Sequence, residues 1–242
     1  MDLRSARLCA APLLCLASLV SGAERSARIP PGYQLQYEEK FERQSALHDF
    51  VMTDPAAWRW TRTNGITALE LFRQSQYQPA VRSPVNIALI AEKSFADFVL
   101  EADLMQTSQE YGHRDMCLFF GFQSPTNFYY THLASAADDH AHNIFIVNGA
   151  PRIRIATETT QGVNWGHGQW HKIRLERQLA DGSIKVYFDD LTKPIMVAKD
   201  KTFGAGYVGF GSFDDTGMAA NIRVWAPAVQ TKRTEFFRRS GR

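Results

Sequence analysis

The chain has 242 residues, with 27 basic and 25 acidic side chains and a formal net charge of +2 at pH 7. Such a balance offers no basic surface to a nucleic acid, and we predict no nucleic-acid partner. Segment 232–242 carries five of the basic residues and one acidic residue. We therefore predict a basic C-terminal tail, 228–242, without fixed structure.

The N-terminus has the pattern of an export signal. Two arginines precede an apolar run at 8–20, and small residues follow at 21–23. This order is typical of a cleaved signal peptide, and the run is too short to span a bilayer. We predict a signal peptide, 1–23, a single domain, 24–227, and no transmembrane segment after cleavage. The predicted location is periplasmic or extracellular, and the oligomeric state stays open.

Short runs rich in β-branched and aromatic residues make up the rest of the chain, separated by Gly, Pro, Asn and Asp. No long stretch shows helical spacing, so the pattern favours an all-β chain. We predict strands at 58–61, 68–73, 85–90, 98–107, 116–123, 128–133, 143–147, 152–156, 170–177, 184–189, 195–198, 207–213 and 221–225.

Two dipeptides predict tight hairpins between these strands. Asn148-Gly149 and Asp181-Gly182 combine residues that tolerate positive φ. Consecutive strands are therefore expected to be largely antiparallel. We predict a two-sheet antiparallel β-sandwich of the jelly-roll kind, with an up-and-down barrel as the alternative.

Alternation along the strands assigns their faces. In "FVLEADLM", Phe98 and Leu100 belong to the core face, whereas Glu101 and Asp103 share the opposite face. In "DMCLFFGFQ" both faces are apolar, so we predict a central strand at 116–123 that is covered on both sides.

Glu101 and Asp103 are the first candidates for chemistry. Their Cα atoms are about 6.5 Å apart in an extended strand. This spacing permits the paired carboxyls of a glycosidase. The alternative is that they are ordinary acids on the outer face of an amphipathic strand.

The stretch "THLASAADDHAHNIFIVNG", 131–149, gathers polar residues between two strand-like runs. Tyr130 and His132 share a face, and Arg152 and Arg154 share a face on a later strand. A tyrosine ring beside such groups suits a sugar, because the ring accepts the apolar side of a pyranose while polar groups bond its hydroxyls. The predicted site residues are Glu101, Asp103 and His132 for catalysis, and Tyr130, Arg152, Arg154, Asn143 and Trp165 for substrate binding. A sugar site would require Glu101, Asp103, Tyr130, His132, Arg152 and Arg154 to face one cavity.

One acidic segment is weighed as a metal site, and a second is interpreted as a turn. The spacing of "DDHAH", 138–142, is not specific for zinc, although Asp138 and Asp139 are oxygen donors of the kind that calcium prefers. We predict no metal and no cofactor, with calcium as the alternative, and "DDHAH" as the rim of a sugar groove or a simple loop. "SFDDTG", 212–217, predicts a loop whose aspartates bond their own backbone.

Three segments occur in an order that resembles a known superfamily. They are "SFADFVLEADLM" at 94–105, "WHKIRLERQLADGSIKVYFDD" at 170–190 and "TFGAGYVGFGSFDDTGMAANIRVW" at 202–225. This order is similar to the concanavalin A-like lectin/glucanase superfamily, and within it to bacterial 3-keto-disaccharide hydrolase-type and laminin G-like domains. The resemblance implies a concanavalin A-like sandwich with a carbohydrate ligand.

Two departures limit what the resemblance implies about activity. Glucanases of the superfamily carry three alternating acids, whereas this chain has Glu101, Asp103 and then Met105. The hydrolase-type domains usually carry an Asn-Ser-Gly run where this chain has "RDMCLFFGFQ". The resemblance implies an exported domain that binds a glycoside, with hydrolysis or elimination if it is an enzyme. The alternative is a non-catalytic lectin-like or laminin G-like module that binds glycan or protein.

Overall fold

The computed structural model of the protein describes residues 29–237. From Gly32 onward these residues belong to one compact unit. The predicted signal peptide, 1–23, lies outside the described residues. No helix in the described part has the length and apolar character needed to cross a bilayer. Its helices are two short 3-10 segments, η1 (Gln44–Asp49) and η2 (Pro55–Ala57).

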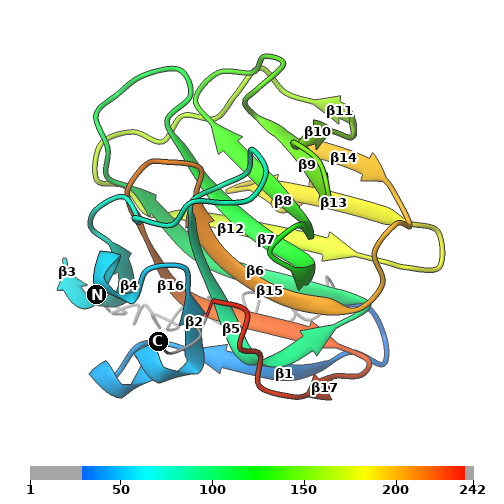
Figure 1. Cartoon of the computed structure of the whole chain (residues 1–242), viewed down its shortest axis with the longest axis horizontal. Coiled ribbons are helices and arrows are strands. Elements are labelled where there is room, and N and C mark those ends of the chain that lie inside the picture. The colour runs from blue at the N-terminus through cyan, green and yellow to red at the C-terminus, as the bar shows by residue number, and fades with distance from the viewer. Residues whose placement is uncertain (1–28, 238–242) are drawn as a thin grey trace, which may run out of the picture. The chain divides into compact units, whose positions relative to one another are not determined.

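The strands of the described chain form two antiparallel sheets that pack face to face (Figure 1). Sheet A has nine strands, in the spatial order β11 (Ala156–Thr159), β14 (Met196–Lys199), β13 (Ser183–Phe188), β12 (His171–Arg177), β6 (Phe98–Gln106), β16 (Gly217–Ala226), β4 (Ile66–Leu71) and β3 (Trp58–Thr63), with β1 (Gln34–Glu39) also on β16. Sheet B has eight strands, in the order β10 (Ile153–Arg154), β9 (Asn143–Asn148), β8 (Asn127–Ala134), β7 (Asp115–Ser124), β15 (Gly206–Ser212), β5 (Asn86–Phe95) and β17 (Gln230–Thr231), with β2 (Phe50–Met52) also on β5. The predicted two-sheet antiparallel sandwich is confirmed.

Both predicted hairpins are present. β12 pairs with β13 across Asp181-Gly182, and β9 pairs with β10 after Asn148-Gly149. Gly182 has φ +79° and Gly149 has φ +69°. Residues with a side chain rarely adopt this left-handed backbone conformation, so glycine allows the chain to reverse direction at these positions.

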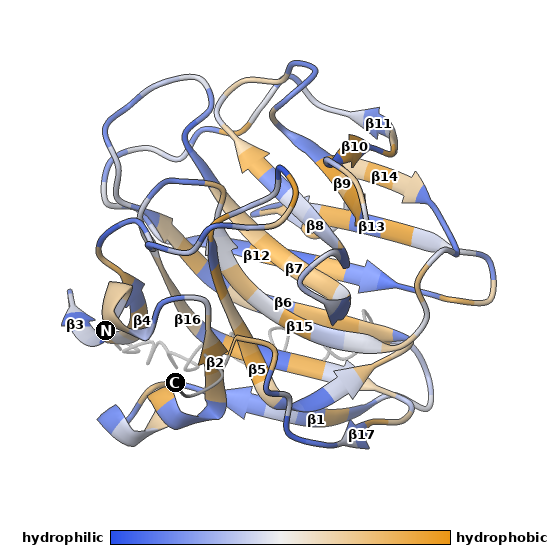
Figure 2. Ribbon diagram, in the orientation of Figure 1, coloured by the Kyte–Doolittle hydropathy of each residue, from blue (hydrophilic) through white to orange (hydrophobic). Residues whose placement is uncertain are grey.

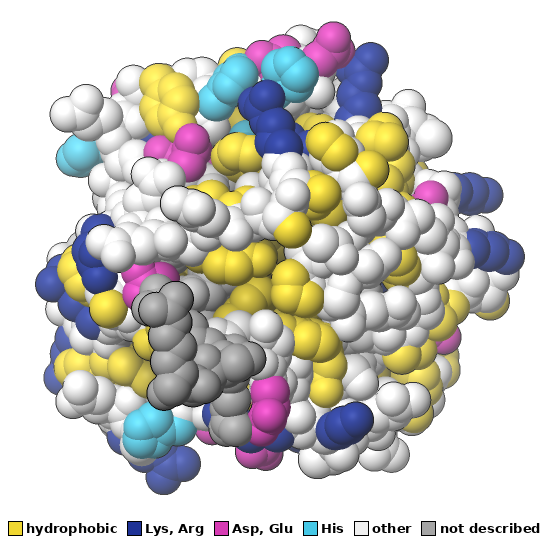
Figure 3. Space-filling model, in the orientation of Figure 1, with side chains coloured by type: hydrophobic (Ala, Val, Ile, Leu, Met, Phe, Trp, Pro, Cys, Tyr) yellow, Lys and Arg dark blue, Asp and Glu magenta, His cyan; other side chains and the backbone are white. Residues whose placement is uncertain are grey.

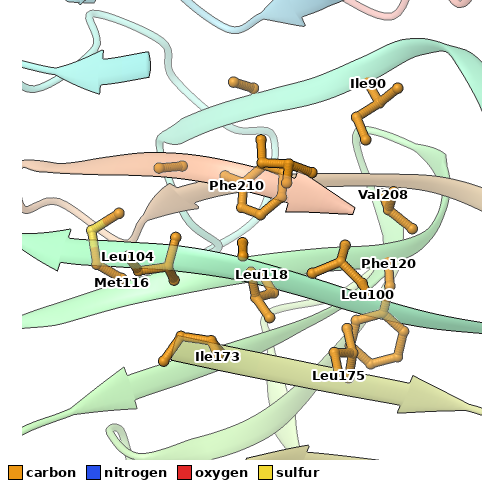
Figure 4. Close-up of a cluster of buried hydrophobic side chains, with 14 of the residues drawn as sticks. Ile90, Leu100, Leu104, Met116, Leu118, Phe120, Ile173, Leu175, Val208 and Phe210 are labelled. Carbon is orange, nitrogen blue, oxygen red and sulfur yellow. The ribbon is translucent and has the colours of Figure 1, made fainter. Parts of the chain in front are cut away.

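The core lies between the two sheets and follows the predicted alternation. Leu100 of β6 and Leu175 of β12, both 0% exposed, face Leu118 of β7 and Phe210 of β15, which are also 0% exposed. Figure 4 shows these side chains converging from strands of both sheets. Burying a large aliphatic or aromatic side chain stabilises a fold by about 1.5–3 kcal/mol, so this layer holds the sheets together.

The outer face of sheet B, which points away from sheet A, carries a second apolar cluster. Figure 2 shows hydrophobic residues along β7, β9 and β5. Val81, Phe236 and Phe237 pack over this cluster from outside the sheet. The prediction that 116–123 is a strand covered on both sides is therefore confirmed. The cluster consists of Ile87, Leu89, Cys117, Phe119, Phe122, Phe128, Tyr130, Phe145 and Val147.

The C-terminal arm, residues 228–237, is part of the fold. Its strand β17 pairs with Lys93 and Ser94 of β5, and the backbone N–H of Thr234 donates to Ala91 O at 2.8 Å. The ring of Phe236 lies 5.4 Å from that of Phe122. The prediction that the chain lacks fixed structure from residue 228 is wrong for this arm, because backbone pairing and two phenylalanines outweigh its basic charge.

Candidate functional site

One end of sheet B brings together three segments that are far apart in sequence. Asp115 begins β7, His132 lies opposite Cys117 on β8, and Gly211 of β15 also pairs with Cys117. The loop after β15 therefore lies beside the start of β7. Figure 3, which views the molecule from the sheet B side, shows histidine, basic and acidic side chains together at the top of this face.

Three aspartates meet at this end of the sheet. Asp115, Asp214 and Asp215 each offer a carboxylate oxygen, and these oxygens lie within 4.8 Å of one another. Asp215 Oδ2 accepts hydrogen bonds from the hydroxyl of Tyr111 at 2.8 Å and from the backbone N–H of Asp115 at 2.9 Å. The prediction that the aspartates of "SFDDTG" bond their own backbone is therefore wrong for Asp215, whose partners precede β7 or begin it.

The surroundings of two of these carboxyls, Asp115 and Asp214, raise their pKa values. Asp115 is 0% exposed and accepts the backbone N–H of Phe213 at 3.0 Å. Burial raises the pKa of Asp115 well above its ordinary value, and the charge of Asp215 adds to this effect. Partial burial and Asp215 also raise the pKa of Asp214, whose side chain reaches the surface. Both shifts disfavour the charged carboxylate at these two positions.

Within the described residues, these three aspartates form the group of potential metal ligands whose oxygen atoms lie close enough together to hold an ion. The predicted alternative calcium residues, Asp138 and Asp139, are not part of such a group. Asp138 instead pairs with His113 at 2.5 Å, and Asp139 pairs with Arg154 at 2.6 Å.

His132 is held as a neutral hydrogen-bond donor. Its Nδ1 accepts the backbone N–H of His142 at 3.3 Å. Since a backbone N–H can only donate, the neutral ring must carry its proton on Nε2. Burial, with the charge of Arg152, holds the pKa of His132 well below its ordinary value. The geometry therefore suits His132 to donating a hydrogen bond better than to accepting a proton.

Arg152 is fixed by aromatic neighbours. Its guanidinium donates to the hydroxyl of Tyr130 at 2.7 Å. Its Cζ atom lies 4.6 Å from the ring centre of Phe145 and 4.2 Å from that of Phe213. Such cation–π contacts cover the faces of the guanidinium, so its remaining N–H groups point along its edges.

A cavity of about 160 Å³ opens at this place. Tyr111 is 45% exposed while its hydroxyl is tied to Asp215, so the ring is held in position and its surface is available. An exposed aromatic ring beside hydrogen-bonding groups suits the apolar face of a sugar. The cavity is lined by Arg82, Tyr111, His113, His132, His140, Arg152, Phe213 and Asp214.

The "DDHAH" segment forms part of the rim of this cavity. His140 lines it, and the backbone N–H of His140 donates to Asp138 Oδ1 at 2.7 Å. His142 turns inward instead, where its Nε2 lies 2.9 Å from Thr160 Oγ1, and burial lowers its pKa to about 4. The segment was predicted to be either the rim of a sugar groove or a simple loop, and His140 does lie at the rim of this cavity.

The predicted binding residues divide at the cavity. His132, predicted for catalysis, and Arg152, predicted for binding, line the cavity. Tyr130 is 0% exposed in the apolar cluster of sheet B and reaches the site only through its hydroxyl, which accepts from Arg152, so the predicted role of its ring as a sugar-binding surface is wrong. Arg154 lies on the edge strand β10 in its ion pair with Asp139. Asn143 lies opposite His132, but its Oδ1 accepts the backbone N–H of Ala156 at 3.1 Å, so it serves the backbone locally.

Glu101 and Asp103 lie elsewhere, on the outer face of sheet A. Asp103 contacts Lys172 at 2.6 Å, and Glu101 contacts Arg174 at 3.4 Å. Both belong to β6, with the whole sandwich core between them and the cavity of sheet B. The requirement that the six residues face one cavity is therefore not met, and the predicted catalytic pair Glu101 and Asp103 does not reach the cavity. Alternation along a strand separates outward from inward side chains, but it does not show to which of the two sheets a strand belongs.

Trp165 is a core residue. It is 0% exposed, and its Nε1–H donates to Leu133 O at 2.9 Å. It cannot offer a ring to a ligand, so its predicted binding role is wrong. Sequence reasoning missed Tyr111, Arg82 and Asp214, and the available signal for Tyr111 was an aromatic residue beside glycine and histidine in a predicted loop.

A larger cavity, about 1240 Å³, lies beside η1, β2 and the C-terminal arm. Its walls are mainly apolar and include Phe50, Met52, Tyr77 and Phe237. The convergent polar groups typical of a specific ligand site gather at the smaller cavity instead. We therefore place the candidate site at the smaller cavity.

No protein-family model and no curated protein matches the chain. Solved structures do match it. A carbohydrate binding module, CBM66, from Bacillus subtilis is 18% identical, with a TM-score of 0.50 over 72% of this chain and 93% of that chain. Domain 4 of AbnA, a GH43 extracellular arabinanase from Geobacillus stearothermophilus, is 11% identical, with a TM-score of 0.50 over 84% and 95%.

The GH43 protein BlXynB from Bacillus licheniformis is 11% identical, with a TM-score of 0.53. The match covers 81% of this chain but 39% of that chain. At such identities the likeness concerns the fold alone, and it agrees with the predicted two-sheet β-sandwich. The narrower resemblance to 3-keto-disaccharide hydrolases stays a prediction.

Proposed function

We propose that the protein is an exported carbohydrate-binding domain whose ligand site is the cavity at the end of sheet B. The observation that carries this proposal is the fixed, exposed ring of Tyr111 beside the donors of Arg152 and His132. The matching folds of a carbohydrate binding module and of an arabinanase domain solved with arabinotriose support it. Export, to the periplasm or outside the cell, is proposed from the predicted signal peptide, 1–23.

The shape of the site favours the end of a saccharide chain. The cavity of about 160 Å³ is smaller than the 300–1,000 Å³ typical of drug-sized ligands. Val81, Phe236 and Phe237 cover the adjoining aromatic face of sheet B, so a long chain cannot lie along the strands there. We propose that a terminal sugar residue enters the cavity and that the rest of the chain stays outside.

Binding is tested by screening the purified protein on a glycan array and measuring each hit by calorimetry. Tyr111→Ala should weaken the affinity for a hit about tenfold, because loss of a stacking contact costs about 1.4 kcal/mol. Phe72→Ala is the matched control, since Phe72 is 39% exposed and lies outside the cavity. An array without saccharide hits, or equal losses for both variants, would overturn the proposal.

Hydrolysis of the bound glycoside, of the 3-keto-disaccharide hydrolase type, is the second candidate. It is favoured by Asp214, which lines the cavity and has a raised pKa, as a general acid requires. Incubating the protein with each array hit and analysing the products tests this candidate. Release of a sugar that Asp214→Asn abolishes while binding persists would support catalysis, and an unchanged ligand would leave a binding domain.

A further inference from the structure

We infer that the saccharide held in this cavity is acidic, with a carboxylate or sulfate group seated against Arg152 and Arg82. This inference rests on the proposed function, since it names the chemical class of ligand for the same site. It follows from a difference between the charges inside the cavity and those at its rim.

The two arginines of the cavity form no close ion pair within the described chain, although both lie near enough to Asp214 for their charges to lower its pKa, against the larger effect of burial. None of the ion pairs formed by residues 29–237 includes Arg82 or Arg152. By contrast, Arg154 at the rim is paired with Asp139, and His113 is paired with Asp138. The cavity therefore keeps two guanidinium groups available where the rim satisfies its charges internally.

The position of Arg152 restricts how a ligand can meet it. The rings of Phe145 and Phe213 cover the guanidinium, and one N–H is used by Tyr130. A planar carboxylate that meets the free edge can accept two parallel hydrogen bonds, which a hydroxyl cannot do. Arg82 is held nearby, because its carbonyl accepts the backbone N–H of Arg152 at 3.1 Å.

Burial disfavours the charged forms of two acidic groups at the site. Asp214 lines the cavity, and Asp115 lies beneath it near His132. Raised pKa values favour the neutral forms of both carboxyls. The Nε2–H of His132 adds a neutral donor. An anionic ligand therefore meets two guanidinium groups and a neutral donor, beside two carboxyls whose charged forms are disfavoured by burial.

The test uses an array and calorimetry with matched probes: uronic-acid oligosaccharides, their methyl esters, and sulfated and unsulfated forms of the same hexoses. We expect acidic hits whose affinity falls at least thirtyfold on esterification or removal of sulfate and also falls with added salt. Uronates and sulfated sugars are separate arms, so the preferred anion is identified.

Arg82→Gln is the principal variant, because Arg82 is exposed and its loss leaves the aromatic packing intact. It should lower the affinity for an acidic probe about tenfold and change that for the ester less than twofold. Arg152→Lys, which keeps the charge but loses the fork, should also weaken acidic binding. Arg62→Gln, an exposed arginine of β3, is the control.

The outcomes separate the two proposals. Hits that are neutral sugars, or equal affinity for acid and ester, would overturn the acidic ligand while leaving carbohydrate binding intact. The absence of any saccharide hit would overturn both.

Discussion

The two outer faces of the sandwich carry similar charged residues in different settings. On sheet A, charges face opposite charges across neighbouring strands, as in Glu38 with Arg223 at 2.8 Å and Asp103 with Lys172 at 2.6 Å. On sheet B, aromatic rings fill the face, and the charged groups at its end include arginines outside any ion pair of the described chain. The ion pairs of sheet A link neighbouring strands, whereas arginines beside a cavity that form no ion pair are available to bind a ligand.

The largest effect should come from the aromatic face of sheet B. Phe119 is 0% exposed there, so Phe119→Ala should lower the free energy of unfolding by about 3–5 kcal/mol. Glu38→Gln on sheet A breaks a partly exposed ion pair and should cost less than about 1 kcal/mol. Urea denaturation of both variants checks the contrast, which equal losses would break.

The buried histidine of the sheet B end should make stability depend on pH. His142 titrates near pH 4 when folded and near 6.5 when unfolded, so the unfolded chain binds more protons in this window and stability falls as pH falls. The loss attributable to His142 is about 3 kcal/mol between pH 6.5 and 4.

His142→Asn isolates that contribution, since asparagine tolerates the φ of +50° at this position and does not titrate. Denaturation curves at pH 6.5 and 4 should show a smaller acid loss for the variant. Parallel pH profiles for variant and parent would mean that His142 is not the group responsible.

The covering of the aromatic face gives a third, smaller effect. Phe236 and Phe237 are half-buried, so replacing both with alanine should cost about 2 kcal/mol in total. Binding of a dye specific for exposed apolar surface should increase at the same time. Lys232→Ala, an exposed position in the same arm, is the control and should change neither measurement.

The smallest effect is expected for Glu101 and Asp103 and tests whether the outer face of sheet A takes part in ligand binding. Glu101→Gln and Asp103→Asn should each leave the affinity for an array hit, and any turnover of it, within twofold of the parent. Both side chains lie on the outer face of the other sheet, so they have no path to the ligand. A tenfold loss in either variant would move the site to sheet A.

Much of the fold could be predicted because alternation and turn residues act locally. The inward residues of β6 and the two apolar faces of β7 follow directly from the sequence pattern. β1 was missed because "QLQYEE" has little β-branched character, and it forms through pairing with β16. β2 and β17 were missed because they are short and depend on β5 for their pairing.

Only part of the candidate site could be predicted from the sequence. Tyr130, His132 and Arg152 could be grouped because β8, β9 and β10 are consecutive hairpin neighbours. Asp214 and Asp215 join them through the pairing of β15 with β7, and Tyr111 through its bond to Asp215. These contacts span about a hundred residues, and no local pattern specifies them.

Strand β5 has one further consequence. One margin pairs with β15, while the other is occupied in turn by β2, near Ile90, and by the arm, from Ala91 to Ser94. An open margin of this kind would present unsatisfied amides to other molecules and invite fibrous self-association. Strand β2 and the C-terminal arm thus cover this edge of β5 between them. A protein truncated before residue 228 should therefore aggregate under conditions in which it is still folded.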